Sequence, residues 1–140
     1  MANGRDATVT GHIEFVTVLM CDDIRREYDG GLSLMGVATP YLEPDEFPVR
    51  RRVSFALIIN TLSEGDVTFS TSLRWAGERR WTVEHGILIE ASERGTIYPI
   101  DGTIAGFDKP GDLVFEVDYK GETIVLQTWS VEGTKSVGAD

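Results

Sequence analysis

Apolar and polar side chains alternate along much of this chain. The clearest stretch is Val67–Trp75, where apolar or Thr side chains at odd positions alternate with Thr, Ser and Arg. Val53–Asn60, Trp81–Ile89 and Leu113–Tyr119 repeat the pattern. Successive side chains of a strand point to opposite faces of its sheet, so a period of two predicts half-buried strands. Ile13–Cys21 is apolar at both odd and even positions, which predicts a central strand covered on both faces.

Turn residues separate these stretches. Ala76–Glu78 and Tyr119–Glu122 predict tight hairpins, and Pro40–Pro48 predicts a loop, because proline cannot donate to a strand ladder. Asp22–Tyr28 is the one segment that could form a short helix, with Asp22 as its N-cap. Strands that recur about every 8–14 residues with turns between them are typical of antiparallel sandwiches and barrels. We expect an all-β chain: a single antiparallel β-sandwich of about eight strands with at most one short helix.

The length of 140 residues suits one domain with its own core. We expect a flexible N-terminus over residues 1–10, the β-sandwich domain over residues 11–132, and a flexible C-terminus over residues 133–140. The beginning of the chain has no apolar stretch typical of a secretory signal, and no run is long enough to cross a bilayer. A cytoplasmic location is the resulting expectation. The single cysteine, Cys21, excludes a disulfide within the chain.

One region resembles a known family. Leu19–Glu27 reads Leu-Met-Cys-Asp-Asp-Ile-Arg-Arg-Glu, and Gly31–Val37 reads Gly-Leu-Ser-Leu-Met-Gly-Val. Together with Phe107–Asp112 they are similar to a bacterial and phage family of short all-β proteins of unknown function, in which a Cys-Asp-Asp turn precedes a Gly-Lys-Leu-Ser-Leu-Ile-Gly-Val-like strand. Gly31 stands here in place of the usual Lys. The resemblance implies a β-sandwich and implies no activity.

Composition argues against several functions. Thirteen basic and 23 acidic side chains give a net charge of −10, which disfavours generic binding to nucleic acid or to anionic membranes. No Gly-rich phosphate loop or nucleophile elbow is present, and only His12 and His85 could serve as histidine bases. Cys21 stands beside Asp22 and Asp23, which disfavour a thiolate, so a buried unreactive cysteine is expected. We therefore predict no catalytic residue and no cofactor.

Metal and carbohydrate sites are weaker possibilities. His12 and His85 lack zinc-ligand spacing, and the acidic loops form no EF-hand, so we predict no metal site. Calcium remains the open alternative for acids gathered at one end of a sandwich: Asp22, Asp23, Glu43, Asp45, Glu46, Asp101, Asp108 and Asp112. An exposed tryptophan face could bind sugar, but Trp75 and Trp81 are expected in the core or as a cross-strand pair, and the direction of Trp129 is undetermined.

Loops at the ends of a sandwich carry function more often than its faces do. The partner-binding candidates are the charged residues of the two loops that begin at Cys21 and Pro40, namely Asp22, Asp23, Arg25, Arg26, Glu43, Asp45 and Glu46. The favoured hypothesis is a non-enzymatic binding or structural module that acts through a protein partner or a homo-oligomer. One alternative is an acidic inhibitor that occupies the basic site of a nucleic-acid enzyme. A second is a small hydrolase that combines Asp22 or Asp23 with His12 or His85.

Overall fold

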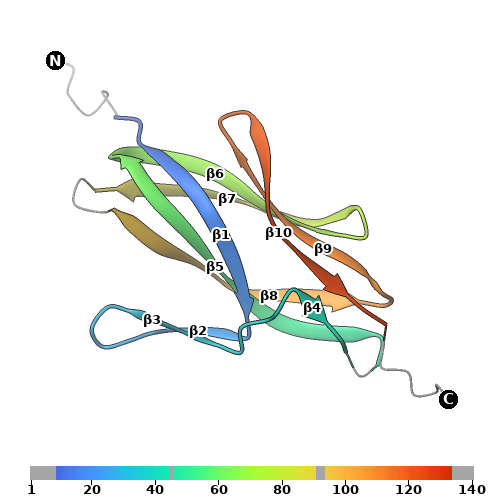
Figure 1. Cartoon of the computed structure of the whole chain (residues 1–140). Helices are drawn as coiled ribbons and strands as arrows, with labels where there is room; N and C mark the ends of the chain where they lie inside the picture. The colour runs from blue at the N-terminus through green and yellow to red at the C-terminus, as the bar shows by residue number, and fades with distance from the viewer. Residues whose placement is uncertain (1–8, 45, 91–93, 134–140) are drawn as a thin grey trace.

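The computed structural model describes residues 9–44, 46–90 and 94–133 (Figure 1). The described residues form ten strands and no helix, so none of them belongs to a helix that could cross a membrane. The strands are β1 (His12–Cys21), β2 (Asp23–Arg26), β3 (Leu32–Met35), β4 (Tyr41–Leu42), β5 (Val49–Ser63), β6 (Gly65–Trp75), β7 (Glu78–Ile89), β8 (Gly95–Phe107), β9 (Gly111–Tyr119) and β10 (Glu122–Val131). The all-β fold is confirmed, with ten strands instead of eight.

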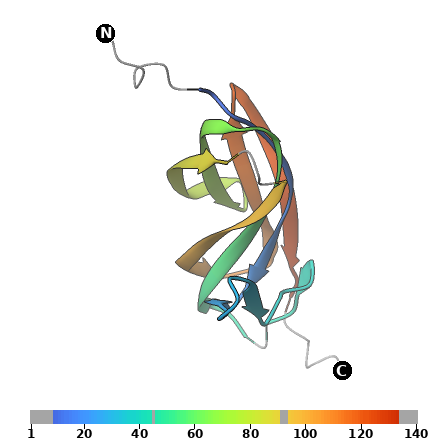
Figure 2. The ribbon, with the colours of Figure 1, turned by 90° about the vertical axis from the view of Figure 1, so that its left-hand side faces the viewer.

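Two sheets pack face to face (Figure 2). One has three strands in the order β1-β5-β8, and the other has five in the order β4-β10-β9-β6-β7. All their pairings are antiparallel except that of β4 with β10. The strands β2 and β3 form a separate two-stranded ribbon that extends away from the body of the sandwich (Figure 1). We call residues 23–35 the arm.

The short helix predicted for Asp22–Tyr28 is wrong. Asp23–Arg26 is strand β2, and it pairs with β3 in a hairpin closed by a bond from the N–H of Glu27 to the carbonyl of Gly31, at 2.8 Å. Only Ile24 among the residues of β2 is apolar, so the segment has no apolar stripe that a helix could bury. Without a helix, Asp22 has no N-cap role.

The predicted Pro40–Pro48 loop contains strand β4. The carbonyl of Pro40 accepts a bond from the N–H of Ser130 at 2.7 Å, and that of Leu42 accepts one from Glu132 at 2.7 Å. Proline lacks a donor but keeps its acceptor, so it can begin a short edge strand.

Strand β1 lies at the edge of its sheet, contrary to the central position predicted for it. Its pairing with β5 shifts between Phe15 and Thr17, which leaves Val16 as the extra residue of a β-bulge. The bulge changes which positions face the core: Ile13 is buried before it, and Val18 and Met20 are buried after it. Apolar side chains at both odd and even positions therefore reflect the bulge and not burial on both faces.

Aromatic side chains fill the space between the sheets. Phe55 of the three-stranded sheet contacts three rings of the five-stranded sheet, with centroid distances of 5.0 Å to Phe115, 5.9 Å to Trp129 and 6.1 Å to Trp81. Phe55 and Phe115 are fully buried, and Trp129 nearly so. The ends predicted to be flexible lie mostly outside the described residues, although Val9 and Thr10 are already tied to the start of β6.

Both predicted hairpins are confirmed as two-residue turns. Ala76 and Gly77 connect β6 to β7, and Lys120 and Gly121 connect β9 to β10. All four have positive φ, between 50° and 84°. Positive φ at both central residues is the geometry of type I′ turns, whose twist matches that of the flanking strands.

Gly65 begins β6 where the chain before β1 crosses it. Its φ is +132°, and a Cβ added there would lie within the van der Waals distance of the Val9 carbonyl oxygen and the Gly11 nitrogen. Bonds from Gly11 N–H to the Asp66 carbonyl, at 2.9 Å, and from Asp66 N–H to the Val9 carbonyl, at 2.8 Å, hold the two segments together.

We expect Gly65→Ala to lower the free energy of unfolding by about 2 kcal/mol or more, because both the backbone angle and the close approach exclude a side chain. Gly86→Ala is the control, since a Cβ at Gly86 on β7 meets no atom within 4 Å. Urea unfolding measures both. Equal losses in the two variants would contradict the close crossing.

Candidate functional site

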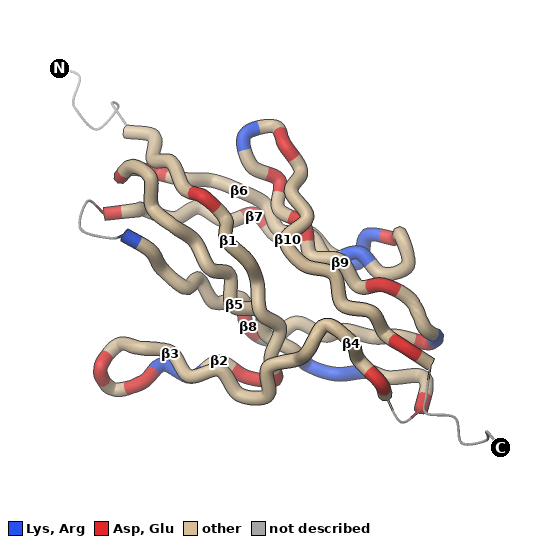
Figure 3. The backbone as a smooth tube through the Cα atoms, viewed as in Figure 1, with Lys and Arg blue, Asp and Glu red and all other residues tan. Residues whose placement is uncertain are grey.

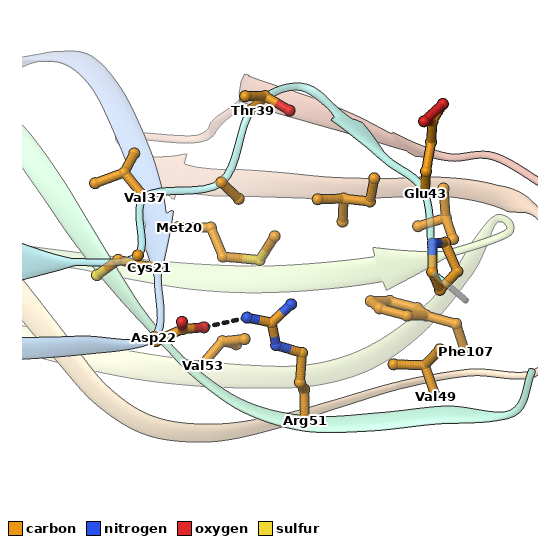
Figure 4. Close-up of a pocket in the computed structure, with 15 residues that line it drawn as sticks. Met20, Cys21, Asp22, Val37, Thr39, Glu43, Val49, Arg51, Val53 and Phe107 are labelled. Carbon is orange, nitrogen blue, oxygen red and sulfur yellow. Dashed lines mark hydrogen bonds and ion pairs between the residues drawn. The ribbon is translucent and has the colours of Figure 1, made fainter. Parts of the chain in front are cut away.

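A pocket of about 420 Å³ opens at one end of the sandwich (Figure 4). Its apolar floor comes from five strands: Met20 of β1, Leu42 of β4, Val49 and Val53 of β5, Phe107 of β8 and Val131 of β10. Val37, in the segment that follows the arm, stands at the other side and is 48% exposed. Volumes of roughly 300–1,000 Å³ with mostly apolar walls are usual for ligand sites. The size and lining of this pocket therefore suit an apolar group.

Charged side chains stand at the mouth of the pocket. Asp22 and Arg51 form an ion pair there (Figure 4), and both side chains are about half exposed. Exposed pairs of this kind stabilise a fold by no more than about 1 kcal/mol. Gly36, with φ +66°, lets the chain pass directly over the Asp22 carboxylate, where a Cβ would collide with it. The pair therefore sets the shape and charge of the mouth more than it stabilises the protein.

The structure divides the predicted partner-binding residues into two groups. Asp22 and Glu43 line the pocket. The others stand outside its lining: Asp23, Arg25 and Arg26 lie on β2 of the arm, and Glu46 is exposed on the loop before β5. Asp45 lies outside the described residues.

Neither Arg51 nor the apolar floor of the pocket was predicted from the sequence. Arg51 belongs to the run Arg50–Arg52, which gives no indication by itself of which arginine faces the pocket. The alternation of β5 contains that signal, because position 51 lies on the same face as Val49 and Val53, and all three line the pocket.

Cys21 is buried beside the pocket, as predicted, with its Sγ 3.6 Å from the carbonyl oxygen of Ser54. Burial is the largest effect and raises the pKa of the Cys21 thiol. The Asp23 backbone N–H partly opposes it, and the carboxylates of Asp22, Asp101 and Asp23 raise the pKa further. The thiol is therefore held in its neutral, unreactive form.

We expect the native protein to resist an aromatic disulfide reagent at pH 8 and to react fully with it in urea. The rate of thiol release, followed by absorbance, measures this. Rapid reaction of Cys21 without denaturant would show that the thiol is accessible and ionised, contrary to its burial.

The two histidines lie elsewhere. His85 of β7 contacts the Thr71 hydroxyl through Nε2 at 2.8 Å and the Tyr98 hydroxyl through Nδ1 at 3.0 Å, and its ring stacks on Phe69 at 4.9 Å. His12 is exposed and contacts Lys120. No histidine lines the pocket, so the described residues do not bring Asp22 and a histidine together there.

Burial lowers the pKa of the His85 imidazole from its ordinary value of 6.5. A lowered pKa in the folded state means that the unfolded chain takes up the proton first as the pH falls. The contribution of His85 to stability is therefore complete above pH 6.5 and is lost as the pH falls from there toward the folded-state pKa.

Replacing His85 by Gln is expected to reduce the loss of stability between pH 7.5 and pH 5. Urea unfolding of both proteins at the two pH values gives the difference. An identical loss in the wild type and in His85→Gln would contradict a depressed pKa for this imidazole.

Metal ligation receives no support from the arrangement of side chains. Within residues 9–44, 46–90 and 94–133, no three His, Cys, Asp or Glu side chains gather closely enough to hold an ion. Figure 3 shows the acidic positions spread over turns and strand ends of the sandwich.

No protein-family model matches this chain, and no curated protein matches it. The resemblance noted from the sequence therefore stays a prediction. Among solved structures, a β-glucosidase from Erythrobacter marinus is similar, with a TM-score of 0.46 and 8% identity over 87% of this chain. The chain spans 16% of the length of that enzyme. A similarity this weak carries no argument about fold or function.

Proposed function

We propose that this protein is a non-enzymatic binding module that receives an apolar side chain of a protein partner in the pocket at the end of its sandwich. One observation supports this most: the pocket floor is apolar and stays open, although it adjoins the buried core. Met20, Val53 and Phe107 are core residues whose surfaces also line the pocket. An apolar cavity open to water at the end of a rigid sandwich is a place where a partner gains free energy by burial.

The surroundings of the pocket favour a protein over other partners. Large apolar side chains are exposed on the segment of the chain that passes the pocket: Met35, Val37 and Tyr41. Exposed apolar groups that gather around one pocket are typical of protein-binding surfaces. Among the described residues, Arg51 is the only basic one in the lining, and it is paired with Asp22, so the pocket offers little to a phosphate group.

The arm supplies the second part of the proposed surface. It begins at the pocket, because Cys21, Asp22 and Gly36, which flank its two strands, belong to the lining. Asp23, Arg25 and Arg26 of β2 would then contact the parts of a partner that extend beyond the pocket. Charges in this outer position affect association rate and selectivity more than affinity.

The test is selection of binders from a displayed library of random peptides, using three proteins. Val37→Trp places a bulky ring at the mouth of the pocket, on a side chain that is 48% exposed and therefore outside the core. Val125→Trp makes the same change on β10 at a side chain that is 56% exposed and outside the pocket lining.

We expect peptides that share a large apolar residue, bind the wild type and Val125→Trp equally, and bind Val37→Trp at least about ten-fold more weakly. Calorimetry on the selected peptides measures the affinities. The proposal fails if no peptide is enriched, or if the enriched peptides bind all three proteins alike.

A further inference from the structure

Strand β7 is a long free edge of the five-stranded sheet. It pairs with β6 on one side, and on its other side the described residues place no strand. A row of unpaired backbone N–H and C=O groups can pair with a strand of another molecule. An edge strand therefore needs a feature that either blocks such pairing or selects the strand that pairs with it. Nothing in the pocket lining comes from β7, so this edge is independent of the proposed partner site.

The pairing with β6 fixes where the side chains of β7 point. Trp81 lies opposite Leu73 and Val83 opposite Thr71, on the face toward the other sheet. Thr82 lies opposite Ser72, and its hydroxyl is 3.0 Å from that of Ser72, on the outer face. The segment around Thr82 thus has one apolar and one polar face.

The inner face of β7 is incompletely covered. Val83 is 42% exposed although it points toward the other sheet, and Trp81 is partly buried although it contacts the core rings of Phe55 and Phe115. The facing sheet has three strands against five, so it does not reach over the whole of β7. A second strand beside β7 would cover the exposed part.

The segment Arg80–Glu84 reads Arg-Trp-Thr-Val-Glu and complements itself when it is reversed. We propose that β7 pairs antiparallel with β7 of a second copy, about a two-fold axis at Thr82. Arg80 then faces Glu84 of the other copy, Trp81 faces Val83, and Thr82 faces its own equivalent. Opposite charges, an aromatic ring with a β-branched side chain, and two threonines are the favourable kinds of cross-strand pair. The two five-stranded sheets become one continuous sheet.

Neighbouring registers lack this match. Pairing about a two-fold axis must keep the inner faces of both copies on the same side of the joined sheet. The axis therefore passes through a residue of β7, and moving it by one residue changes every cross-strand pair. An axis at Trp81 or at Val83 leaves Arg80 without a carboxylate opposite it. An axis at Glu84 sets two copies of that carboxylate against each other. The β6–β7 ladder is irregular between Arg79 and Trp81, because Arg80 has no partner on β6, and its regular part begins at Trp81.

The charges at both ends of the segment are available. Glu84 is exposed and makes no ion pair within the described part of the chain. Arg80 is about half exposed and has only a 3.7 Å contact with the exposed Glu78. An exposed contact of that length leaves the guanidinium free to pair with a carboxylate of another copy.

The test measures molecular mass by sedimentation equilibrium from micromolar to millimolar protein. The wild type is expected to shift from monomer to dimer across that range. Arg80→Glu and Glu84→Arg each set like charges against each other twice in a dimer, and each is expected to weaken dimerisation by at least about ten-fold. The double variant Arg80→Glu/Glu84→Arg exchanges the charges and is expected to restore the dimer.

Two control variants change the net charge equally at exposed positions away from β7. Arg52→Glu on β5 matches Arg80→Glu, and Glu122→Arg at the start of β10 matches Glu84→Arg; both are expected to dimerise like the wild type. A wild type that stays monomeric at all concentrations overturns the proposal. So does a dimer that the single reversals do not weaken, or that the double variant does not restore.

Discussion

The contacts of Phe55 with the rings of the opposite sheet are the interaction on which the rest of the structure depends. Phe55 is the point where the central strand of the three-stranded sheet touches Phe115, Trp129 and Trp81 of the other sheet. Truncating such a buried ring to Ala typically costs about 3–5 kcal/mol, a large part of the stability of a small domain. These rings join two sheets that no regular strand pairing connects. Their positions decide which parts of each sheet are covered.

Both proposed surfaces lie where one sheet no longer covers the other. At one end, the chain between the arm and β5 crosses from one sheet to the other, and the floor of the pocket is the last layer of the core beneath it. At one side, the five-stranded sheet extends beyond the three-stranded one and leaves part of the inner face of β7, around Val83, exposed. A rigid core thus presents two incompletely covered regions, each of a different shape. The pocket suits a side chain, and the edge suits a strand.

Local pattern predicted most of the long strands and both tight turns, although it did not single out β8. Burial of one face and the chemistry of a two-residue turn depend on residues that are close in the sequence. Local pattern failed where pairing with distant strands decides the outcome. The Asp22–Tyr28 segment became β2 because Leu32–Met35 offers it a partner, and Tyr41–Leu42 became β4 because the end of β10 accepts it. Trp75 and Trp81 both reach the core, but the register sets Trp81 opposite Leu73 and not opposite Trp75.

The candidate site was predictable to a similar degree. The position of functional loops at one end of a sandwich pointed to Asp22 and Glu43, which line the pocket. The apolar floor could not be predicted, because it combines residues from five strands far apart in the sequence. The same applies to β7: its self-complementary segment can be recognised in the sequence, but only the strand order shows that no strand of the described residues covers its edge.

Native-state hydrogen exchange is the most direct test of whether the ring contacts join the two sheets into one cooperative unit. We expect the slowest amides of β5 and of β9 to exchange with the same free energy of opening, equal to that of global unfolding, and amides of the arm to exchange through much smaller openings. Different opening free energies for β5 and β9 would show that the sheets separate independently. That result would contradict the role assigned to Phe55 and its partners.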